Sequence, residues 1–375
     1  MSSTPKAPDP EVSPTGEQPV APDGTAAIVP PRPRFGGITG ASLYESLFNQ
    51  PSFSVLIAVA LVLVLLGIAH PGFFTLGQIQ DVLQGSVYVG VMACGMAFLI
   101  AMRLLDLSVS SILALTAGIG ALLMNAGWNP WLAALGALVA GAAMGAFNGF
   151  LVVTIRINAL LATLATLYVY NGLNQGLTDS NTVILGYTTS DVAIKGNHAA
   201  TSSFFTIFNG NFLDIPVAAW LMLGFALILT LILVFTPFGY RVRSIGSNPE
   251  AAEFSGISIP RVTYQAFILV GVVTGLAGLL ILLFFKDADP SVGGADNLLA
   301  IAAVIIGGTP MRGGSGTVFG AMVGAILLTG LVQSALPYFN IPDDWSQFAL
   351  GTVILVAVAV DSILRASRRR GALTG

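Results

Sequence analysis

The chain has very little charge for its length. Only 9% of its 375 residues are Asp, Glu, Lys or Arg, whereas 55% are hydrophobic. A soluble domain carries roughly 25% charged residues, so this chain cannot cover a folded surface of its size with charge. The composition excludes a conventional soluble enzyme and predicts a protein embedded in lipid.

Cysteine and histidine are nearly absent. The one cysteine, Cys94, cannot form an intramolecular disulfide. His70 and His198 lie outside the apolar runs, and no His-Glu-x-x-His pattern occurs, so we expect no metal site, no haem and no cofactor. A serine hydrolase inside the apolar runs would also lack its usual histidine base.

Lysine is equally scarce, and Lys6, Lys195 and Lys286 are the only ones. None of them belongs to a Gly-x-x-x-x-Gly-Lys-Ser/Thr pattern, so the chain has no phosphate loop of that type. The arginines stand at the edges of apolar runs and do not form a surface that could follow a nucleic acid. We therefore expect no catalytic residues, no ATP hydrolysis by this chain and no nucleic-acid binding.

Long apolar runs, in contrast, are abundant, and a helix needs about 20 such residues to cross a bilayer. Ten runs predict an all-α polytopic membrane protein with about ten transmembrane helices. Their ranges are 53–69, 82–102, 107–124, 130–153, 158–176, 216–236, 263–285, 297–311, 315–336 and 345–364. The eighth run is short and ends in Gly307-Gly308-Thr309-Pro310, which favours a broken or re-entrant element.

The basic residues give this arrangement an orientation. With the N-terminus inside, every Lys and Arg except Lys195 and Lys286 falls in a predicted inner segment. Cytoplasmic loops of membrane proteins carry such an excess of basic residues. Adding or removing one span would reverse every later loop, so the pattern predicts that both termini are cytoplasmic.

The two ends of the chain differ from its middle. Residues 1–45 are rich in proline and poor in large apolar side chains, which predicts a disordered cytoplasmic tail. Residues 46–366 hold the predicted transmembrane domain, with its longest inner loop at 237–262. Residues 367–375 form a basic cytoplasmic tail, in which Arg368, Arg369 and Arg370 would anchor the inner face.

Glycine recurs at every fourth position in several runs, for example at Gly141, Gly145 and Gly149. Helices in lipid approach closely through small residues, so this spacing predicts a tightly packed bundle. The segments 141–147 and 320–326 share the pattern Gly-x-x-x-Gly-Ala and lie five runs apart. A unit of five helices that is repeated once reverses its direction in the membrane. The shared pattern therefore favours an inverted repeat.

The longest inner loop has the pattern of a short helix. Asn248, Pro249 and Glu250 supply an N-cap, a proline at the first helical position and an acid in the first turn. Gly256 suits the end of such a helix. A capped helix outside the bilayer is either an ordinary loop helix or a contact for a soluble partner.

This loop resembles the cytoplasmic coupling segment of bacterial ABC-importer permeases for simple sugars, a branch related to branched-chain amino-acid permeases. The family pattern is close to Thr-x-Phe-Gly-Arg, Gly-Gly-Asn-x-Glu-Ala-Ala and Ser-Gly-Ile. The chain matches it at Thr236, Phe238, Gly239, Gly246, Asn248, Glu250, Ala251, Ala252, Ser255, Gly256 and Ile257. Residues 299–309 with 313–316, and residues 106–115, are similar to two further family blocks. The resemblance covers about residues 50 to 365.

The resemblance implies the membrane subunit of an ATP-driven importer for a monosaccharide or similar polyol, in the bacterial inner membrane. The implied partners are two ABC ATPase subunits, a second identical or closely related permease and a periplasmic solute-binding protein. The ATPases would grip the loop around Arg241, Arg243, Asn248, Pro249, Glu250, Ala251, Ala252, Ser255 and Gly256. The family motif of the eighth run is Gly307, Gly308 and Thr309.

Polar residues within the runs are candidates for lining the solute path. A carboxylate there is costly unless it is paired or lines a wet cavity, which singles out Asp106. A neutral, sugar-like solute requires neutral donors and acceptors. The predicted set is Asp106, Ser108, Ser110, Ser111, Asn148, Thr163, Asn171 and Gln175. Hydrogen bonding between helices is the alternative function of these residues.

The chain departs from the family pattern in front of Asp106. Arg103, Leu104 and Leu105 stand where small residues are usual, and Ser110 replaces a glycine. The spacing allows Arg103 to pair with Asp106, and a positive anchor at the inner face is the simpler interpretation.

Two other functions stay open on the sequence alone. An ion-coupled secondary transporter would need a buried acid, for which Asp106 and Asp361 are the candidates. An ABC permease for another small solute, such as an amino acid, would share the coupling loop. The solute itself is not encoded in a readable motif, because selectivity is expected to lie largely with the binding protein.

Overall fold

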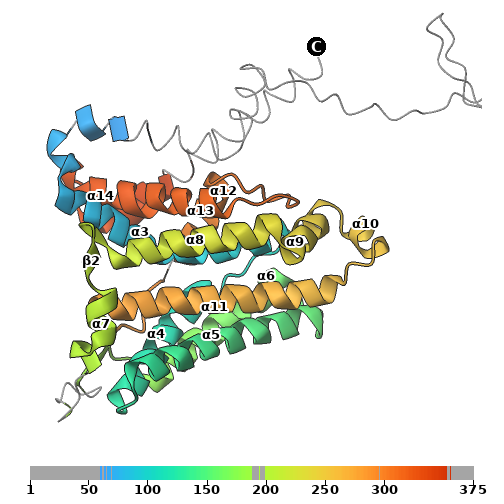
Figure 1. The fold of residues 1–375 in the computed structure, drawn as a ribbon, viewed down its shortest axis with the longest axis horizontal. Coiled ribbons are helices and arrows are strands. Elements are labelled where there is room, and N and C mark those ends of the chain that lie inside the picture. The colour runs from blue at the N-terminus through green and yellow to red at the C-terminus, as the bar shows by residue number, and fades with distance from the viewer. Residues whose placement is uncertain are drawn as a thin grey trace, which may run out of the picture. The chain divides into compact units, whose positions relative to one another are not determined.

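The described part of the chain is almost entirely helical (Figure 1). The computed structural model describes residues 60, 63–64, 66–68, 70–187, 194, 199–294, 296–352 and 355. The predicted tails at 1–45 and 367–375 lie outside the described residues. So do most of the first predicted run and the last part of the tenth.

The long helices follow the predicted runs closely. Their bounds are α3 Leu76–Ala101, α4 Val109–Asn125, α5 Pro130–Val153, α6 Ala159–Leu177, α8 Val217–Phe235 and α11 Ile259–Phe285. The largest difference is the start of α3, which begins at Leu76 and not at residue 82. The cause is local, because the Thr75 hydroxyl accepts a hydrogen bond of 3.3 Å from the Gln78 backbone N–H and caps the helix.

The described helices place most of the basic residues at one end of the bundle. The ends of α3, α5 and α8 lie beside the start of α11, as the contact of Gly149 with Tyr264 illustrates for α5. We call this the arginine end, since it carries Arg103, Arg156, Arg241, Arg243, Arg261 and Arg312. Lys286 lies at the opposite end. The grouping agrees with the predicted inner and outer segments.

The opposite end, which we call the strand end, carries short strands and one short helix. There β1 Val183–Ile184 pairs with β4 Asp287–Ala288, and β2 Asn211–Phe212 pairs with β3 Ile215–Pro216, both antiparallel. The helix α7 Ser203–Phe208 precedes β2. These elements close the loops between the long helices on the side away from the arginines (Figure 1).

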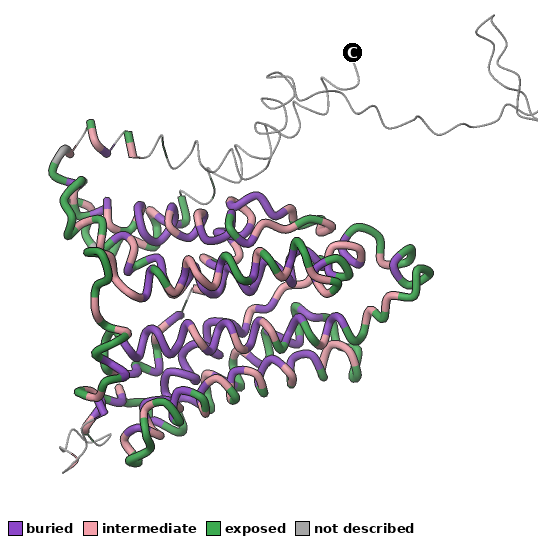
Figure 2. The backbone as a smooth tube through the Cα atoms, in the orientation of Figure 1, coloured by how far each residue is buried: buried purple, intermediate pink, exposed green. Residues whose placement is uncertain are grey.

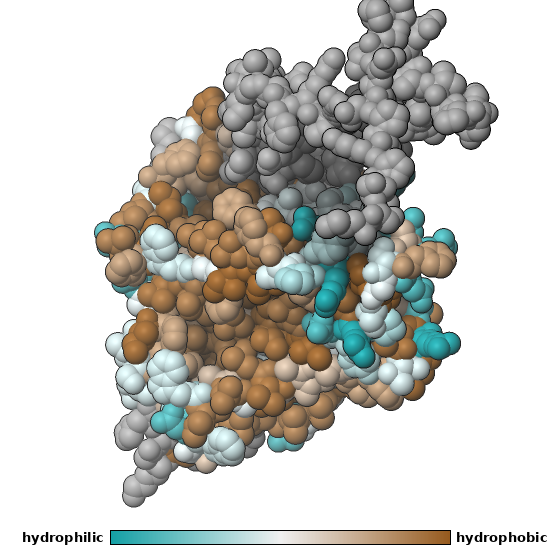
Figure 3. Space-filling model, turned by 45° about the vertical axis from the view of Figure 1, so that its right-hand side comes forward, coloured by the Kyte–Doolittle hydropathy of each residue, from teal (hydrophilic) through white to brown (hydrophobic). Residues whose placement is uncertain are grey.

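Five described helices are long and apolar enough to cross a membrane. They are Leu76–Ala101, Pro130–Val153, Val217–Phe235, Ile259–Phe285 and Val318–Phe339, whereas α4 and α12 Asp296–Ile306 are apolar but shorter. Figure 3 shows apolar side chains over most of the visible surface and hydrophilic ones gathered toward α9 and α10. The protein is therefore polytopic and helical. The count of ten spans, the position of the termini and the repeat stay predictions.

Glycines bring α5 and α11 into backbone contact. A Cβ atom built on Gly141 would lie 2.6 Å from the Gly271 carbonyl oxygen, closer than real Cβ atoms approach. Gly145 meets the Phe267 carbonyl in the same way. Figure 2 shows the buried residues along the facing sides of α11, α5 and α4. The spacing of every fourth residue thus marks a close helix interface, as predicted.

The eighth predicted run is a broken element. After β4 the chain passes through residues 289–294 in turns, and α12 that follows has only 11 residues. The next segment, α13 Val318–Ala325, returns beside α12 with the backbones of Gly307 and Gly320 in contact. Helical structure then continues through η3 Ile326–Val332, α14 Gln333–Ala335 and η4 Leu336–Phe339.

Candidate functional site

The loop between α3 and α4, residues 102–108, holds a fully buried carboxylate. Asp106 accepts two hydrogen bonds from Ser108 on Oδ1, one from the backbone N–H at 2.8 Å and one from the hydroxyl at 2.6 Å. Its Oδ2 accepts a third from the Asn148 side chain at 3.2 Å. We call residues 102–108 the junction loop. All three hydrogen bonds to Asp106 come from neutral groups, and no basic side chain of the described residues pairs with it.

Two further side chains complete this polar network. Asn148 of α5 also donates to the Ser108 hydroxyl at 2.8 Å. The Tyr170 hydroxyl of α6 donates to the Asn148 side-chain oxygen at 3.2 Å and to the Met144 carbonyl at 3.0 Å. A buried network of this kind is stable only when each member has partners, and here each helps to satisfy the next.

The backbone of the junction loop is held by two more helices. The Leu107 N–H donates to the Thr163 hydroxyl of α6 at 3.1 Å, and the Leu107 carbonyl accepts from Asn297 of α12 at 3.0 Å. The loop therefore contacts α5, α6 and α12 at once. Asn148 lies five residues before the end of α5, so the network sits about 7 Å inward from the arginine end.

The structure brings most of the predicted path residues together but separates two of them. Ser110, Ser111 and Thr163 are buried beside the network, and the Ser111 hydroxyl donates to the Ser108 carbonyl at 2.8 Å. Asn171 and Gln175 instead contact each other, at 3.5 Å, on a more exposed part of α6. They are not part of the network, because they lie two to three turns farther along the helix than Thr163.

Arg103 does not pair with Asp106, although the sequence spacing allowed such a pair. Its Nε donates to the Gly246 carbonyl at 2.7 Å, and its Nη2 donates to the Ser247 carbonyl at 2.8 Å. These carbonyls end α9 Pro237–Ser247, where a positive charge is favourable. The junction loop is not helical, and Arg103 has a φ of 64°, so the helical spacing on which the pairing depended does not exist.

A second link to α9 is made by backbone alone. The Gly314 N–H donates to the Ala101 carbonyl at 2.9 Å, and a Cβ on Gly246 would overlap that same carbonyl. Gly313, with a φ of 70°, packs on the Arg103 side chain. The end of α3, the end of α9 and the Gly313–Gly316 segment therefore meet at one point. Two of these segments belong to sequence blocks that carry the family resemblance, and the third, the end of α3, leads into the block at 106–115.

The motif Gly307-Gly308-Thr309 forms the turn that ends α12. Gly308 has a φ of 94°, which favours glycine. The Thr309 hydroxyl accepts from the Thr317 N–H at 3.0 Å, and the Thr317 hydroxyl donates to the Gly307 carbonyl at 2.6 Å. The motif thus fixes the hairpin of α12 and α13 and directs Gly313 toward the junction loop.

The short helix predicted in the longest inner loop is present as α10 Pro249–Phe254. The Asn248 side chain caps it by accepting from the Ala251 N–H at 3.1 Å, and Gly256 follows its end with a φ of 80°. Glu250, Ala251 and Ser255 are exposed, and only Ala252 of this helix is buried. Phe254 is 93% exposed, an unusual placement for a large apolar side chain outside a lipid-facing helix.

The sequence did not lead us to predict α9 or the hydrogen bonds that hold it against α8. The Thr236 hydroxyl caps α9 at 3.2 Å, and the Arg243 Nη2 donates to the Val234 carbonyl of α8 at 3.2 Å. Arg241 is exposed and lines a recess beside α10 together with Ser258 and Arg261. Thr236 followed by Pro237 is an N-cap signal of the same kind as Asn248-Pro249, and it would have revealed α9.

Tyr170 and Asn297 were also missed as members of the network. A tyrosine in an apolar run normally needs a partner for its hydroxyl, and Tyr170 lies one turn beyond Thr166. Asn297 opens the broken eighth element, where a polar side chain has free backbone groups within reach. In both cases the residue type gave a signal, but the partner came from a distant helix.

Comparison with known proteins places the chain among transport permeases. Residues 78–358 match the family model described as the branched-chain amino acid transport system / permease component. The ribose import permease protein RbsC of Haemophilus influenzae is 32% identical over 85% of this chain and 94% of its own length. The L-arabinose ABC transporter permease protein AraH of Azospirillum brasilense is 32% identical over 94% of this chain and 97% of its own. No solved structure matches the chain.

Proposed function

Because the chain belongs to the family of permease components of the branched-chain amino acid transport system, we propose that it forms the membrane path of an ATP-driven sugar importer. The relatives named for ribose and L-arabinose import cover nearly the whole chain, which supports a monosaccharide or similar polyol as solute. ATP hydrolysis then occurs on separate ATPase chains. The protein is a transport subunit and not an enzyme.

The observation that carries this proposal is the geometry of α9 and α10. Both are capped, both lie outside the long helices, and α10 exposes most of its side chains. They are joined by short contacts to the junction loop and to the segment after α12. A displacement of α10 by an ATPase would move α9, and the hydrogen bonds of α9 would transmit that movement to the junction loop and to the segment after α12. A switch between two states requires such a connection.

The polar network around Asp106 supports the proposed path. Ser108, Asn148 and Thr163 supply neutral donors and acceptors beside the Asp106 carboxylate, a set that suits hydroxyl groups. In the described conformation the network is closed to solvent. We propose that it lines the path when the helices around the junction loop separate, with Ser110 and Ser111 next to it. Asn171 and Gln175 would lie at a wider part of the path.

The proposed assembly holds four further subunits. Two ATPase subunits contact α10 and the surrounding Arg241, Arg243 and Asn248–Gly256 segment, and a second permease copy completes the path. A periplasmic binding protein delivers the solute at the strand end. The arginine end faces the cytoplasm of a bacterial inner membrane, in agreement with the excess of basic residues there.

Reconstitution tests the proposal. Vesicles carrying the permease, its ATPase and its binding protein are expected to accumulate a pentose, hexose or polyol only when ATP is present. Glu250→Arg reverses an exposed charge on α10, so we expect uptake to be lost while membrane insertion is kept. Arg156→Gln, at the same end but outside α9 and α10, is the control. Normal uptake by Glu250→Arg would contradict the assignment of the coupling helix.

One observation favours a second candidate, an ion-coupled transporter. Asp106 is buried without a basic partner, as a site for a coupling ion or proton would be. Such a protein would take up solute after ATP depletion and stop when the proton gradient collapses. Uptake that depends on ATP and survives collapse of the gradient supports the importer instead.

A further inference from the structure

The strand end contains a recess lined by amide and aromatic side chains, separate from the network around Asp106. Its cavity volume is about 180 Å³, which is below the roughly 300–1,000 Å³ of sites for drug-sized ligands and limits the recess to a small solute. We call it the amide recess. Its members used here are Gln80 and Gln84 of α3, Phe208 and Asn209 of the α7 region, Asn211 of β2 and Phe284 of α11.

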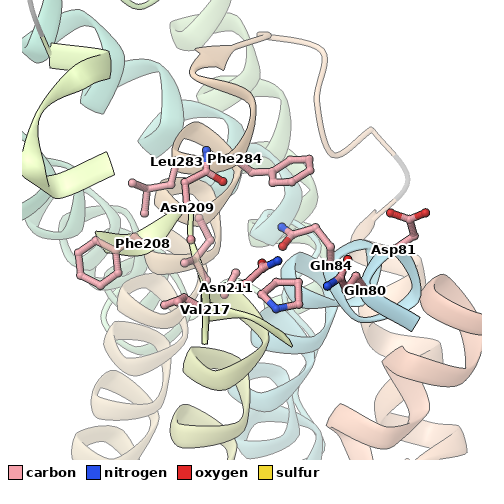
Figure 4. Close-up of a pocket in the computed structure, with 13 residues that line it drawn as sticks. Gln80, Asp81, Gln84, Phe208, Asn209, Asn211, Val217, Leu283 and Phe284 are labelled. Atoms are coloured by element: carbon pink, nitrogen blue, oxygen red, sulfur yellow. The ribbon is translucent and has the colours of Figure 1, made fainter. Parts of the chain in front are cut away.

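The amides of this recess have hydrogen-bonding capacity to spare. Gln80 donates to the Asp214 carbonyl at 2.7 Å and Gln84 donates to the Tyr88 hydroxyl at 2.9 Å, which fixes both side chains. Among the described residues, none donates to their side-chain oxygens, and the amides of Asn209 and Asn211 have no partner. Figure 4 shows the side chains of Gln84 and Asn211 directed toward each other across the recess.

The charge of the lining selects the kind of ligand. No Lys, Arg or His lines the recess among the described residues, and Asp81 is its one ionisable side chain. Figure 4 shows the Asp81 carboxylate pointing away from the four amides. An amino acid or a phosphorylated sugar would require an opposite charge here. Neutral amides that donate and accept, next to Phe208 and Phe284, suit a ring with hydroxyl groups on its rim and C–H groups on its faces.

The position of the recess connects it to the opposite end of the bundle. It is built on the start of α3, the start of α8 and the end of α11. The other ends of these three helices carry the junction loop, α9 and α10. With 26 residues, α3 spans about 39 Å, so the recess and the coupling helix lie on opposite sides of a bilayer.

From this geometry we propose that the amide recess is a binding site for a neutral, hydroxyl-rich solute of monosaccharide size at the outer mouth of the path. The site receives the solute before it reaches the closed network around Asp106. The inference rests on the proposed function, because the direction of movement comes from there. It adds the location of a solute site and the chemical class of its ligand, neither of which the three motif blocks indicate.

Thiol labelling tests the site directly. Cys94 is the only cysteine and is fully buried, so Asn211→Cys introduces a single accessible thiol at the recess. We expect D-ribose or L-arabinose, added at millimolar concentration to the reconstituted complex, to slow maleimide labelling at least threefold. Thr206→Cys, exposed on α7 outside the recess lining, is the matched control, and its labelling should not respond to sugar.

Uptake by a second variant provides an independent readout. Gln84→Met keeps the size of the side chain and removes its hydrogen-bonding groups. We expect it to lower uptake at saturating binding protein by about three- to tenfold, as the loss of one or two hydrogen bonds predicts. ATP hydrolysis stimulated by the loaded binding protein should be kept, because α10 is unchanged. Gly77→Ala, on the same helix but outside the recess lining and with nothing within 4 Å of the new Cβ, should transport like the parent protein.

The experiments distinguish a failure of the proposed solute site from a failure of the proposed function. If the parent complex takes up sugar with ATP but labelling of Asn211→Cys ignores every sugar tested, the recess is not a solute site. Protection by L-leucine and not by sugars would also overturn the inferred ligand class. If the parent complex accumulates no sugar at all, the proposed function itself is wrong.

Discussion

The same three-residue turn occurs at both ends of the bundle, with very different surroundings. In Asp106-Leu107-Ser108 and in Asp289-Pro290-Ser291, the serine N–H donates to the aspartate at 2.8 Å and the serine hydroxyl at 2.6 Å. Asp106 is fully buried and also bound by Asn148, whereas Asp289 is exposed. The local sequence determines the turn, and the surrounding helices determine what the turn can do.

The difference extends to the two ends as a whole. At the arginine end, backbone groups of Ala101, Gly246 and Gly314 touch without intervening side chains, so a displacement of one must move the others. At the strand end, the amide recess has open space and amide groups that have no partner among the described residues. We interpret the first as the part that transmits movement and the second as the part that receives solute.

The largest effect is expected from filling the backbone contact at the arginine end. In Gly246→Ala the new Cβ would overlap the Ala101 carbonyl and lie 2.5 Å from the Gly314 nitrogen. Overpacking of this kind costs about 1–3 kcal/mol. We expect at least a tenfold loss of ATP-driven uptake and a lower melting temperature. Gly172→Ala, where nothing lies within 4 Å, should leave both unchanged.

The paired turns give the next prediction. In Asp106→Asn an amide NH₂ group would face the Asn148 NH₂ group, so a buried donor loses its acceptor, at a cost of about 1–3 kcal/mol. The melting temperature of the purified protein should fall by several degrees. Asp289→Asn makes the same change in an exposed turn and should shift it by less than one degree. Equal shifts in the two variants would show that burial does not distinguish the turns.

A smaller effect is expected at Arg103, because the backbone contacts there remain. Arg103→Gln removes the two hydrogen bonds to the end of α9. A hydrogen bond from a charged group contributes about 1.5–3 kcal/mol to stability. We expect three- to tenfold lower uptake per ATP hydrolysed, with binding of the ATPase kept. Arg103→Lys, which keeps the charge, should recover part of the coupling. A variant with normal coupling would make Arg103 a simple membrane anchor.

The smallest effect is expected at Asn171 and Gln175, which the sequence predicted as path residues but which lie apart from the network around Asp106. Asn171→Ala and Gln175→Ala remove side chains that contact each other and not the network around Asp106. We expect uptake within a factor of two of the parent protein for the double variant. A tenfold loss would show that the solute contacts these two side chains directly and that the path is narrow beside α6.

Local patterns in the sequence predicted much of the fold. The apolar runs anticipated the long helices to within a few residues, and Asn248-Pro249 with Gly256 anticipated α10. The glycine spacing marked the contact of α5 with α11. Each of these features depends on neighbours in the chain or on one helix face, which is why the sequence alone reveals it.

The candidate site was harder to predict, because its contacts join distant segments. Arg103 reaches Gly246, 143 residues away, and Asn297 reaches Leu107, 190 residues away. The helical spacing that suggested an Arg103–Asp106 pair fails because the junction loop leaves the helix at Ala101. The amide recess joins three segments that share no motif, so no local pattern indicated it.

Our central proposal is that α3, α8 and α11 connect α10, the proposed coupling helix, to the amide recess. The most direct measurement is the rate of maleimide labelling of Asn211→Cys in the full complex, with and without ATP trapped on the ATPase. We predict that trapping changes this rate at least threefold and that adding Arg103→Gln reduces the change. The same labelling rate in both nucleotide states, in a complex that hydrolyses ATP and imports sugar, would contradict the account.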